Sequence, residues 1–443
     1  MRDREESSTR ALNTCDRMML YAHETLRSMG YPGFLNQTHV WLGRRVDVDL
    51  LRRAVSKLGE RHPVFVSHIS MNGRRPYWTA RAGHKCTVTE TSIEDSQDDG
   101  VLRHAEALLV EPMELSRSAP ISFHLLHLRD GRDVFLIHND HTLMDANGAL
   151  PLLAEIGRLA AGNDERADPA AAGALDPLRK ILQDAPWMQR LRAARYRRSV
   201  RSFISRHATM MLVDDRSSHP PCTKQRLAVR LLDERQTDSF LERVRRIGGL
   251  PSPSMALLAS AFRAVNQLAG PGSPEAARLK VTVGTNLRSR RGTAPVFCNL
   301  ASVLELSVAP HEVEDRDALC RLLTKQLRER IQRGYDLGHL QVAAWFAGFA
   351  RLVRRRSLRR LTNDHSLIYG YVNWPKDAID RLCGAPITRV HQPVGVWSPP
   401  GLALAATRCA GRLSLIATYT PESVPESRVQ RFLDWVVQDM LGE

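Results

Sequence analysis

The stretch from residue 121 to residue 140 constrains the fold most, because two apolar runs flank a tight-turn signal. The runs are ISFHLLHL (121–128) and DVFLIHND (133–140), and Asp130-Gly131 lies between them. Asp-Gly supports turns in which the backbone adopts positive φ, so this stretch predicts an antiparallel β-hairpin. A helix is expected soon after it, at residues 146–161.

The rest of the chain mixes helix and strand patterns. Helices are expected at 46–62, with Asp49 as the N-cap, and at 251–268, 315–333 and 426–441. Strands are expected at 64–69, 279–287, 300–308, 365–374 and, as a second hairpin, 402–419. This mixture predicts an α/β (α+β) fold built in layers.

The length of 443 residues is too great for one compact core, so two lobes are expected. Residues 162–177 are rich in Gly, Asp, Ala and Pro, which is typical of a linker. We therefore predict an N-terminal lobe at 1–175, a linker with a basic helical segment at 176–222, and a C-terminal lobe at 223–443.

The net charge of +15 comes almost entirely from arginine and includes two dense basic runs, 190–206 and 351–360. The ordinary explanation is solvated helix faces in a protein from a GC-rich genome. The functional explanation is attraction to an acidic carrier protein, to phosphates of coenzyme A or to a membrane surface. We find no known nucleic-acid-binding module, so no nucleic-acid partner is predicted.

Cysteine usage and hydropathy predict a cytoplasmic protein. The seven cysteines are dispersed and include no CxxC pair, which fits a reducing compartment better than a disulfide scaffold or a zinc ribbon. No run of 18 apolar residues predicts a membrane span, and the charged N-terminus does not read as a secretory signal.

The segment HNDHTLMDANG (138–148) is the strongest candidate for chemistry. His141 follows the predicted strand end, where an imidazole can project into a cleft and act as a general base, and Asp145 can brace the loop. The simpler interpretation is a structural histidine followed by a helix-capping aspartate. A metal cluster of nearby histidines is not predicted, because strand residues three apart point to opposite faces; those histidines are His124, His127, His138 and His141.

This segment resembles the HHxxxDG motif of the condensation-domain and chloramphenicol acetyltransferase-like acyltransferase superfamily. Similar family segments occur in order at 46–69 (VDVDLLRRAVSKLGERHPVFVSHI), 281–292 (VTVGTNLRSRRG), 297–306 (FCNLASVLEL) and 366–375 (SLIYGYVNWP). The chain departs from the motif at Asp140, which replaces the first His, and at Ala146, which replaces the Gly. It also lacks the DFGWG signature of plant-type members, with VGVWSPPG (394–401) roughly in its place.

The resemblance implies two similar sheet-and-helix lobes with an active-site channel between them. It makes His141 the catalytic base and gives Asp145 a structural role, paired with Arg288 or Arg290. The further candidates for the substrate channel or for stabilising an oxyanion are Asn286, Arg288, Asn299 and Asn373. No bound cofactor or metal is expected.

The function implied is transfer of an acyl group from a thioester, on coenzyme A or an acidic carrier protein, to a hydroxyl or amine of a small-molecule acceptor. Bacterial secondary-metabolite or lipid biosynthesis is the expected setting, and a monomer is expected. Two alternatives stay open: a stand-alone condensation enzyme that joins carrier-bound substrates, and a non-catalytic carrier-docking protein of the same fold. A membrane-surface lipid acyltransferase is also considered, because segment 180–211 is basic and amphipathic.

Overall fold

A computed structural model describes the chain from residue 9 to residue 443 with gaps. The residues outside the description are 1–8, 73–74, 82, 95–97, 164–185, 206–207, 214–223, 270–276, 289–296, 347–363 and 376–378. The predicted linker therefore lies almost wholly outside the described residues, and the second basic run, 351–360, lies wholly outside them.

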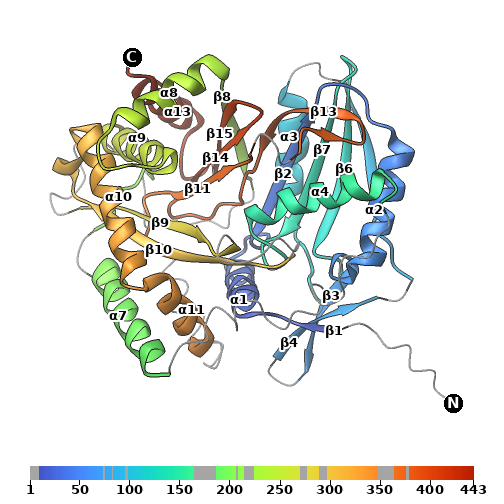
Figure 1. Ribbon diagram of the computed structural model, residues 1–443, viewed down its shortest axis with the longest axis horizontal. Helices are drawn as coiled ribbons and strands as arrows, with labels where there is room; N and C mark the ends of the chain where they lie inside the picture. The colour runs from blue at the N-terminus through green and yellow to red at the C-terminus, as the bar shows by residue number, and fades with distance from the viewer. Residues whose placement is uncertain are drawn as a thin grey trace.

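The described residues form two lobes of mixed α/β structure (Figure 1). The main sheet of the first lobe has six strands in the order β12-β13-β2-β7-β6-β5. Their bounds are β2 (Leu35–Leu42), β5 (Val88–Ile93), β6 (Ile121–Leu128), β7 (Asp133–Asp140), β12 (Arg381–Leu382) and β13 (Ala385–His391). Strands β12 and β13 come from near the end of the chain, so this sheet combines residues from both predicted lobes.

Helices cover both faces of this sheet. Successive side chains of its strands point to opposite faces, and apolar side chains are present on both. Phe135 and Ile137 share a core with α2 (Val48–Arg61) and α4 (Ala149–Ala160). Val134 and Leu136 point to the opposite face, where α3 (Asp98–Val110) packs. A small sheet of β1 (Thr9–Ala11), β4 (Arg75–Ala80) and β3 (Ser67–Asn72) completes this lobe.

The second lobe is built around a four-stranded sheet in the order β11-β14-β15-β8. Its strands are β8 (Arg226–Leu232), β11 (Ile368–Asn373), β14 (Leu402–Cys409) and β15 (Arg412–Tyr419). One apolar core joins this sheet to four helices: α8 (Glu234–Arg246), α9 (Pro253–Leu268), α10 (Arg316–Gln332) and α13 (Glu426–Leu441).

A two-stranded sheet and helix α1 (Thr14–Ser28) lie where the lobes meet, and two further helices pack beside that sheet (Figure 1). Strands β9 (Leu279–Asn286) and β10 (Ala301–Val308) pair antiparallel and reach from the second lobe toward α1, as Figure 1 shows. Helices α7 (Pro186–Ser205) and α11 (Tyr335–Phe346) pack together beside β10. Three 3₁₀ turns, at Pro63–Val66, Ala146–Gly148 and Pro310–Val313, complete the described elements.

Both predicted hairpins are confirmed, but three local expectations were wrong. The N-cap of α2 is Asp47, whose side chain accepts from the Leu50 amide, and not Asp49. The first half of the predicted strand 64–69 is a 3₁₀ turn, because it follows Pro63, and β3 begins only at Ser67. The helix predicted from residue 146 begins as a 3₁₀ turn and becomes α4 at Ala149.

The described part of the first basic run lies on α7, which leaves a mixed apolar and cationic stripe exposed. Tyr196 faces α11, where its ring lies 5.4 Å from that of His339. On the opposite side Trp187 and Leu191 are 66% and 41% exposed. Arg195 and Arg198 follow on the same side of the helix and are exposed as well. No helix among the described residues is both long enough and apolar enough to cross a bilayer.

One face of the first sheet buries several histidines. The rings of His39 on β2 and His391 on β13 lie 6.2 Å apart. Burial lowers the pKa of His39 and of His138 to about 3, that of His124 to about 4, and that of His391 well below its usual value. These side chains are therefore neutral in the folded protein near pH 7.

The buried histidines predict acid-sensitive stability. Each has a lower pKa in the folded chain than the ordinary value near 6.5, so the unfolded chain binds more protons below that pH. The free energy of unfolding should then fall with decreasing pH, by up to about 1.4 kcal/mol per pH unit for each histidine. Urea unfolding between pH 7.5 and pH 5 measures this slope. His391→Leu should reduce it, exposed His311→Leu should not, and equal slopes in all three proteins would contradict the prediction.

Candidate active site

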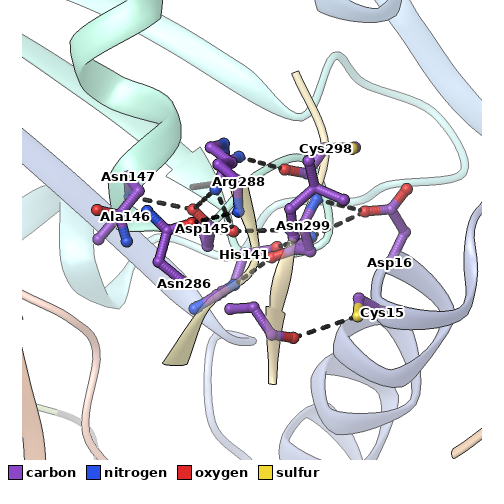
Figure 2. A network of polar contacts seen from close by, with 12 residues as sticks. Cys15, Asp16, His141, Asp145, Ala146, Asn147, Asn286, Arg288, Cys298 and Asn299 are labelled. Carbon is purple, nitrogen blue, oxygen red and sulfur yellow. Dashed lines mark hydrogen bonds and ion pairs between the residues drawn. The ribbon is translucent and has the colours of Figure 1, made fainter. Parts of the chain in front are cut away.

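The candidate histidine is held at the end of β7 by its own backbone. The Asp140 amide donates to the Pro120 carbonyl, and the His141 amide donates to the Phe34 carbonyl at 2.7 Å. A turn then leads to α4, where the Asp145 side chain caps the 3₁₀ turn by accepting from the Asn147 amide. The chain therefore leaves the sheet at a fixed point, and the His141 side chain projects from that point toward the second lobe (Figure 2).

The His141 ring is held on one nitrogen and left open on the other. Its Nδ1 lies 3.1 Å from Oδ1 of Asn299, which stands just before β10. The Phe34 ring covers one side, with ring centroids 4.5 Å apart. The residue is half-buried, and Nε2 has no hydrogen-bond partner among the described residues.

The surroundings of Asn299 determine which ring nitrogen carries the proton. Its Nδ2 lies 3.0 Å from Oδ1 of Asp16 and 2.9 and 3.1 Å from the carbonyls of His141 and Thr142. All three are acceptors, so the amide nitrogen must face them and Oδ1 must face His141. An amide oxygen only accepts, so Nδ1 of the histidine donates and the lone pair of the neutral ring lies on Nε2.

Asp145 connects the same loop to the second lobe. Both of its carboxylate oxygens accept from Nη1 of Arg288, at 2.6 and 2.8 Å, and Oδ2 also accepts from the Leu300 amide. The other guanidinium nitrogen, Nη2, donates to the Cys298 carbonyl at 2.7 Å. Asp145 is 6% exposed, so this is a largely buried ion pair between the lobes (Figure 2).

Asp140, the residue that replaces the first His of the motif, pairs with a histidine from another helix. Its Oδ2 lies 2.6 Å from Nδ1 of His23 on α1, and its Oδ1 accepts from the Thr142 amide. Burial lowers the pKa of His23, but the Asp140 charge and hydrogen bond outweigh it and raise that pKa above its usual value. Burial raises the pKa of Asp140, but the charge and hydrogen bond of His23 lower it by more. The pKa of this carboxyl group is therefore below its usual value.

Not all of the other predicted site residues lie beside His141. Asn286 ends β9, and its Oδ1 accepts from the Arg288 amide, beside the 3₁₀ turn in Figure 2. Asn373 is exposed at the end of β11, in the sheet of the second lobe. Arg290 lies outside the described residues.

The histidines near His141 are engaged separately. His127 contacts Glu90 and Asp133, whereas His124 contacts Ser122 and His138 contacts the Gln37 amide. Within the described ranges, no three His, Cys, Asp or Glu side chains are grouped so as to hold a metal ion.

Sequence reasoning missed three residues that hold the segment around the histidine: Asp16 and His23 on α1, and Phe34 just before β2. A signal for Asp16 existed, since Asn13 and Asp16 have the N-cap spacing and form a capping box in the structure. Nothing in the local pattern indicated that Asp16 would also reach the backbone of Asn299, which lies 283 residues away.

Comparison with solved structures identifies the architecture. The first condensation domain of the CDA synthetase superposes with a TM-score of 0.73 at 14% identity, over 98% of this chain and 97% of that one. A trichothecene 15-O-acetyltransferase from Fusarium sporotrichioides gives 0.71 at 12%, over 98% and 95%. The condensation domain of the monacolin K polyketide synthase gives 0.67 at 13%, over 98% and 97%.

These likenesses show that the chain has the two-lobed chloramphenicol acetyltransferase-like fold of condensation domains, as expected from its motifs. No protein-family model matches the sequence, and neither does any curated protein. At such low identity the likeness extends to the fold and does not by itself assign a reaction.

Removing the Asp145 carboxylate should destabilise the protein far more than removing a surface carboxylate. Asp145→Ala leaves Arg288 buried without its anion and the Leu300 amide without its acceptor, which should cost about 3–5 kcal/mol. Glu242→Ala breaks an exposed ion pair with Arg246 on α8 and should cost at most about 1 kcal/mol. Urea unfolding of both variants measures the difference, and equal losses would contradict a structural role for Asp145.

Proposed function

We propose that this protein is an acyltransferase that moves an acyl group from a thioester to a hydroxyl or amine acceptor, with His141 as the general base. The observation that carries the proposal is the state of the imidazole: Asn299 holds Nδ1, while Nε2 has no partner in the described part of the chain and the ring is half-exposed. A histidine held in one tautomer with an open Nε2 is suited to taking a proton from an incoming nucleophile.

In the proposed reaction Nε2 of His141 removes the proton from the acceptor O–H or N–H as that atom attacks the thioester carbonyl. A new C–O or C–N bond forms, and the tetrahedral intermediate then breaks its C–S bond. The imidazolium returns the proton to the leaving sulfur as a thiol, so the histidine ends in its starting form. No step in this scheme requires a metal or a bound prosthetic group.

Asn299 and Arg288 support this chemistry by holding the loop rather than by binding an oxyanion. The Asn299 amide hydrogens face Asp16 and two backbone carbonyls. The two terminal nitrogens of Arg288 are occupied by Asp145 and by the Cys298 carbonyl. We therefore assign both residues to positioning, which leaves the oxyanion donor without an assigned residue.

We place the docking of the acidic thioester donor on α7. The proposal rests on the outward side of the helix, where Trp187 and Leu191 are exposed and Arg195 and Arg198 follow at helical spacing. Described α7 carries no acidic residue. Exposed apolar side chains beside arginines complement a partner that carries phosphates or carboxylates, which fits coenzyme A or an acidic carrier protein.

Three alternatives are separable by experiment. A condensation enzyme would use carrier-bound substrates and fail with coenzyme A thioesters. A docking protein would bind acidic carriers without turnover. A lipid acyltransferase acting at a membrane surface would float with anionic vesicles.

Replacement of His141 should abolish most turnover. His141→Ala removes the general base and should lower kcat by roughly 10²–10⁴-fold, while His84→Ala, at an exposed histidine, should leave it unchanged. Intact-mass analysis of acceptors incubated with a panel of acyl thioesters measures product. Full turnover by folded His141→Ala protein would refute the assigned role.

Charge reversal on α7 should weaken donor binding without affecting the chemical step. Arg195→Glu combined with Arg198→Glu should raise KM for the thioester donor by about tenfold at low ionic strength, leave kcat near its starting value, and lose its effect as salt increases. Arg235→Glu combined with Arg245→Glu makes the same change in net charge on α8 and is the matched control. An unchanged KM in the double variant would move donor docking away from α7.

A further inference from the structure

Asp16 is a buried carboxylate in the first turn of α1 that contacts the second lobe. It is 1% exposed, and its Oδ1 accepts from both the backbone amide and the side-chain Nδ2 of Asn299, at 2.8 and 3.0 Å. Its Oδ2 accepts from the Asn13 amide at 3.3 Å and lies 4.0 Å from Nη2 of Arg10. The carboxylate therefore joins two functions, capping α1 and holding Asn299.

Two elements, β1 and the first turn of α1, fix the backbone of residues 297–301 at several points. Nη2 of Arg10 donates to the Phe297 carbonyl at 2.9 Å, and Cys15 Sγ donates to the Ala301 carbonyl at 3.2 Å. Asp16 is the member of this set that contacts the Asn299 side chain as well as its backbone. It is thus placed to control the direction in which the Asn299 amide points.

A helix cap alone does not explain Asp16. Asn13 already caps α1, since its side chain accepts from the Asp16 amide at 2.9 Å, and burying an ionisable carboxyl group beside it is costly unless that group is used. Figure 2 shows Asp16, Asn299 and His141 in a line that ends at the imidazole. The line passes from a carboxylate through an amide to Nδ1 of the ring.

We propose that Asp16 is a positioning residue for His141: by holding the Asn299 amide it fixes the imidazole in its Nδ1–H form and supports the positive charge that the ring gains in the reaction. The inference rests on the proposed function for its kinetic consequence. Its structural consequence, the tautomer of His141, does not depend on any activity. Asp16 acts through Asn299 and makes no contact of its own with the ring among the contacts described.

The electrostatic setting of Asp16 makes its charge sensitive to mild acid. Burial raises the pKa of Asp16 to about 6, against the opposing effects of the Arg10 charge and the hydrogen bonds from Asn299 and Asn13. The charged or titratable groups that face it are Arg10 and the buried thiol of Cys298. Above pH 6 the carboxylate carries its negative charge, and below pH 6 it loses that charge.

Two variants and two controls test the proposal. Asp16→Asn keeps the shape of the side chain and removes its negative charge. It also replaces one accepting oxygen by an NH₂ group, which then faces an N–H donor. Asn299→Ala removes the amide that connects Asp16 to the ring. Cys15→Ala, from the same helical turn, loses a contact to residue 301. Asn13→Ala weakens the α1 cap and loses its hydrogen bond to the Asn299 carbonyl, but it leaves the contacts of Asp16 to the two amide groups of Asn299.

The first readout is nitrogen NMR of histidine-labelled protein, with the His141 signals assigned by their absence from His141→Gln. The parent protein and both controls should show the Nδ1–H form. Asp16→Asn and Asn299→Ala should show a mixture with Nε2–H. A pure Nδ1–H form in Asp16→Asn would overturn the proposal, and this holds even if the parent protein had no turnover and the proposed function had failed.

The second readout is the pH dependence of kcat/KM. Asn299→Ala should lose about 100-fold in kcat and Asp16→Asn about tenfold, with KM for both substrates changed less than threefold. The acid limb should also become shallower in Asp16→Asn, because one ionisation is removed. If Asp16 only stabilised the fold, its replacement would lower kcat/KM at every pH without changing the slope of the acid limb. An unaltered pH profile of kcat/KM in Asp16→Asn, alongside an inactive His141→Ala, would overturn the positioning role of Asp16. It would leave the acyltransferase proposal standing.

Discussion

The geometry of the candidate site depends on the orientation of one buried amide. The Asn299 side chain has two hydrogens to donate and one oxygen that accepts, and its surroundings offer acceptors on the nitrogen side only. Its oxygen is therefore directed at Nδ1 of His141. A residue of the second lobe thus sets the proton position on a ring that belongs to the first lobe, and this tautomer is fixed only when the lobes are joined.

Two buried carboxylates of the first lobe secure that junction by binding neighbouring points of the second. Asp145 accepts from the Leu300 amide and pairs with Arg288, and Asp16 accepts from the Asn299 amide. Charged groups of this kind contribute little net free energy when they are buried, but leaving either half unpaired is costly. The arrangement therefore favours one register of the two lobes. A shift of either lobe would break contacts to residues 288, 299 and 300 together.

The sequence predicted what depends on neighbouring residues and missed what depends on distant pairing. The hairpin of β6 and β7 is local, since Asp130-Gly131 specifies the turn, and Gly131 does adopt a φ of +84°. The pairing of β13 with β2 joins residues about 350 positions apart, and no turn signal connects them. The same limit applies to the site. His141 and Asp145 were predicted from the resemblance of their segment and its neighbours to a family motif, whereas Asp16 and His23 reach the site only because α1 folds against the lobe junction.

Asp140, which stands where the family motif has its first histidine, holds the loop through two contacts. The Asp140 carboxylate binds the Thr142 amide on one oxygen and His23 on the other, so it fixes the backbone on both sides of His141. The close approach of His23 requires a glycine at position 33, where an added Cβ would lie 2.6 Å from the ring. The raised pKa of His23 and the lowered pKa of Asp140 favour the charged pair. Helix α1 therefore supports the candidate base twice, through the residue before it and through the amide beside it.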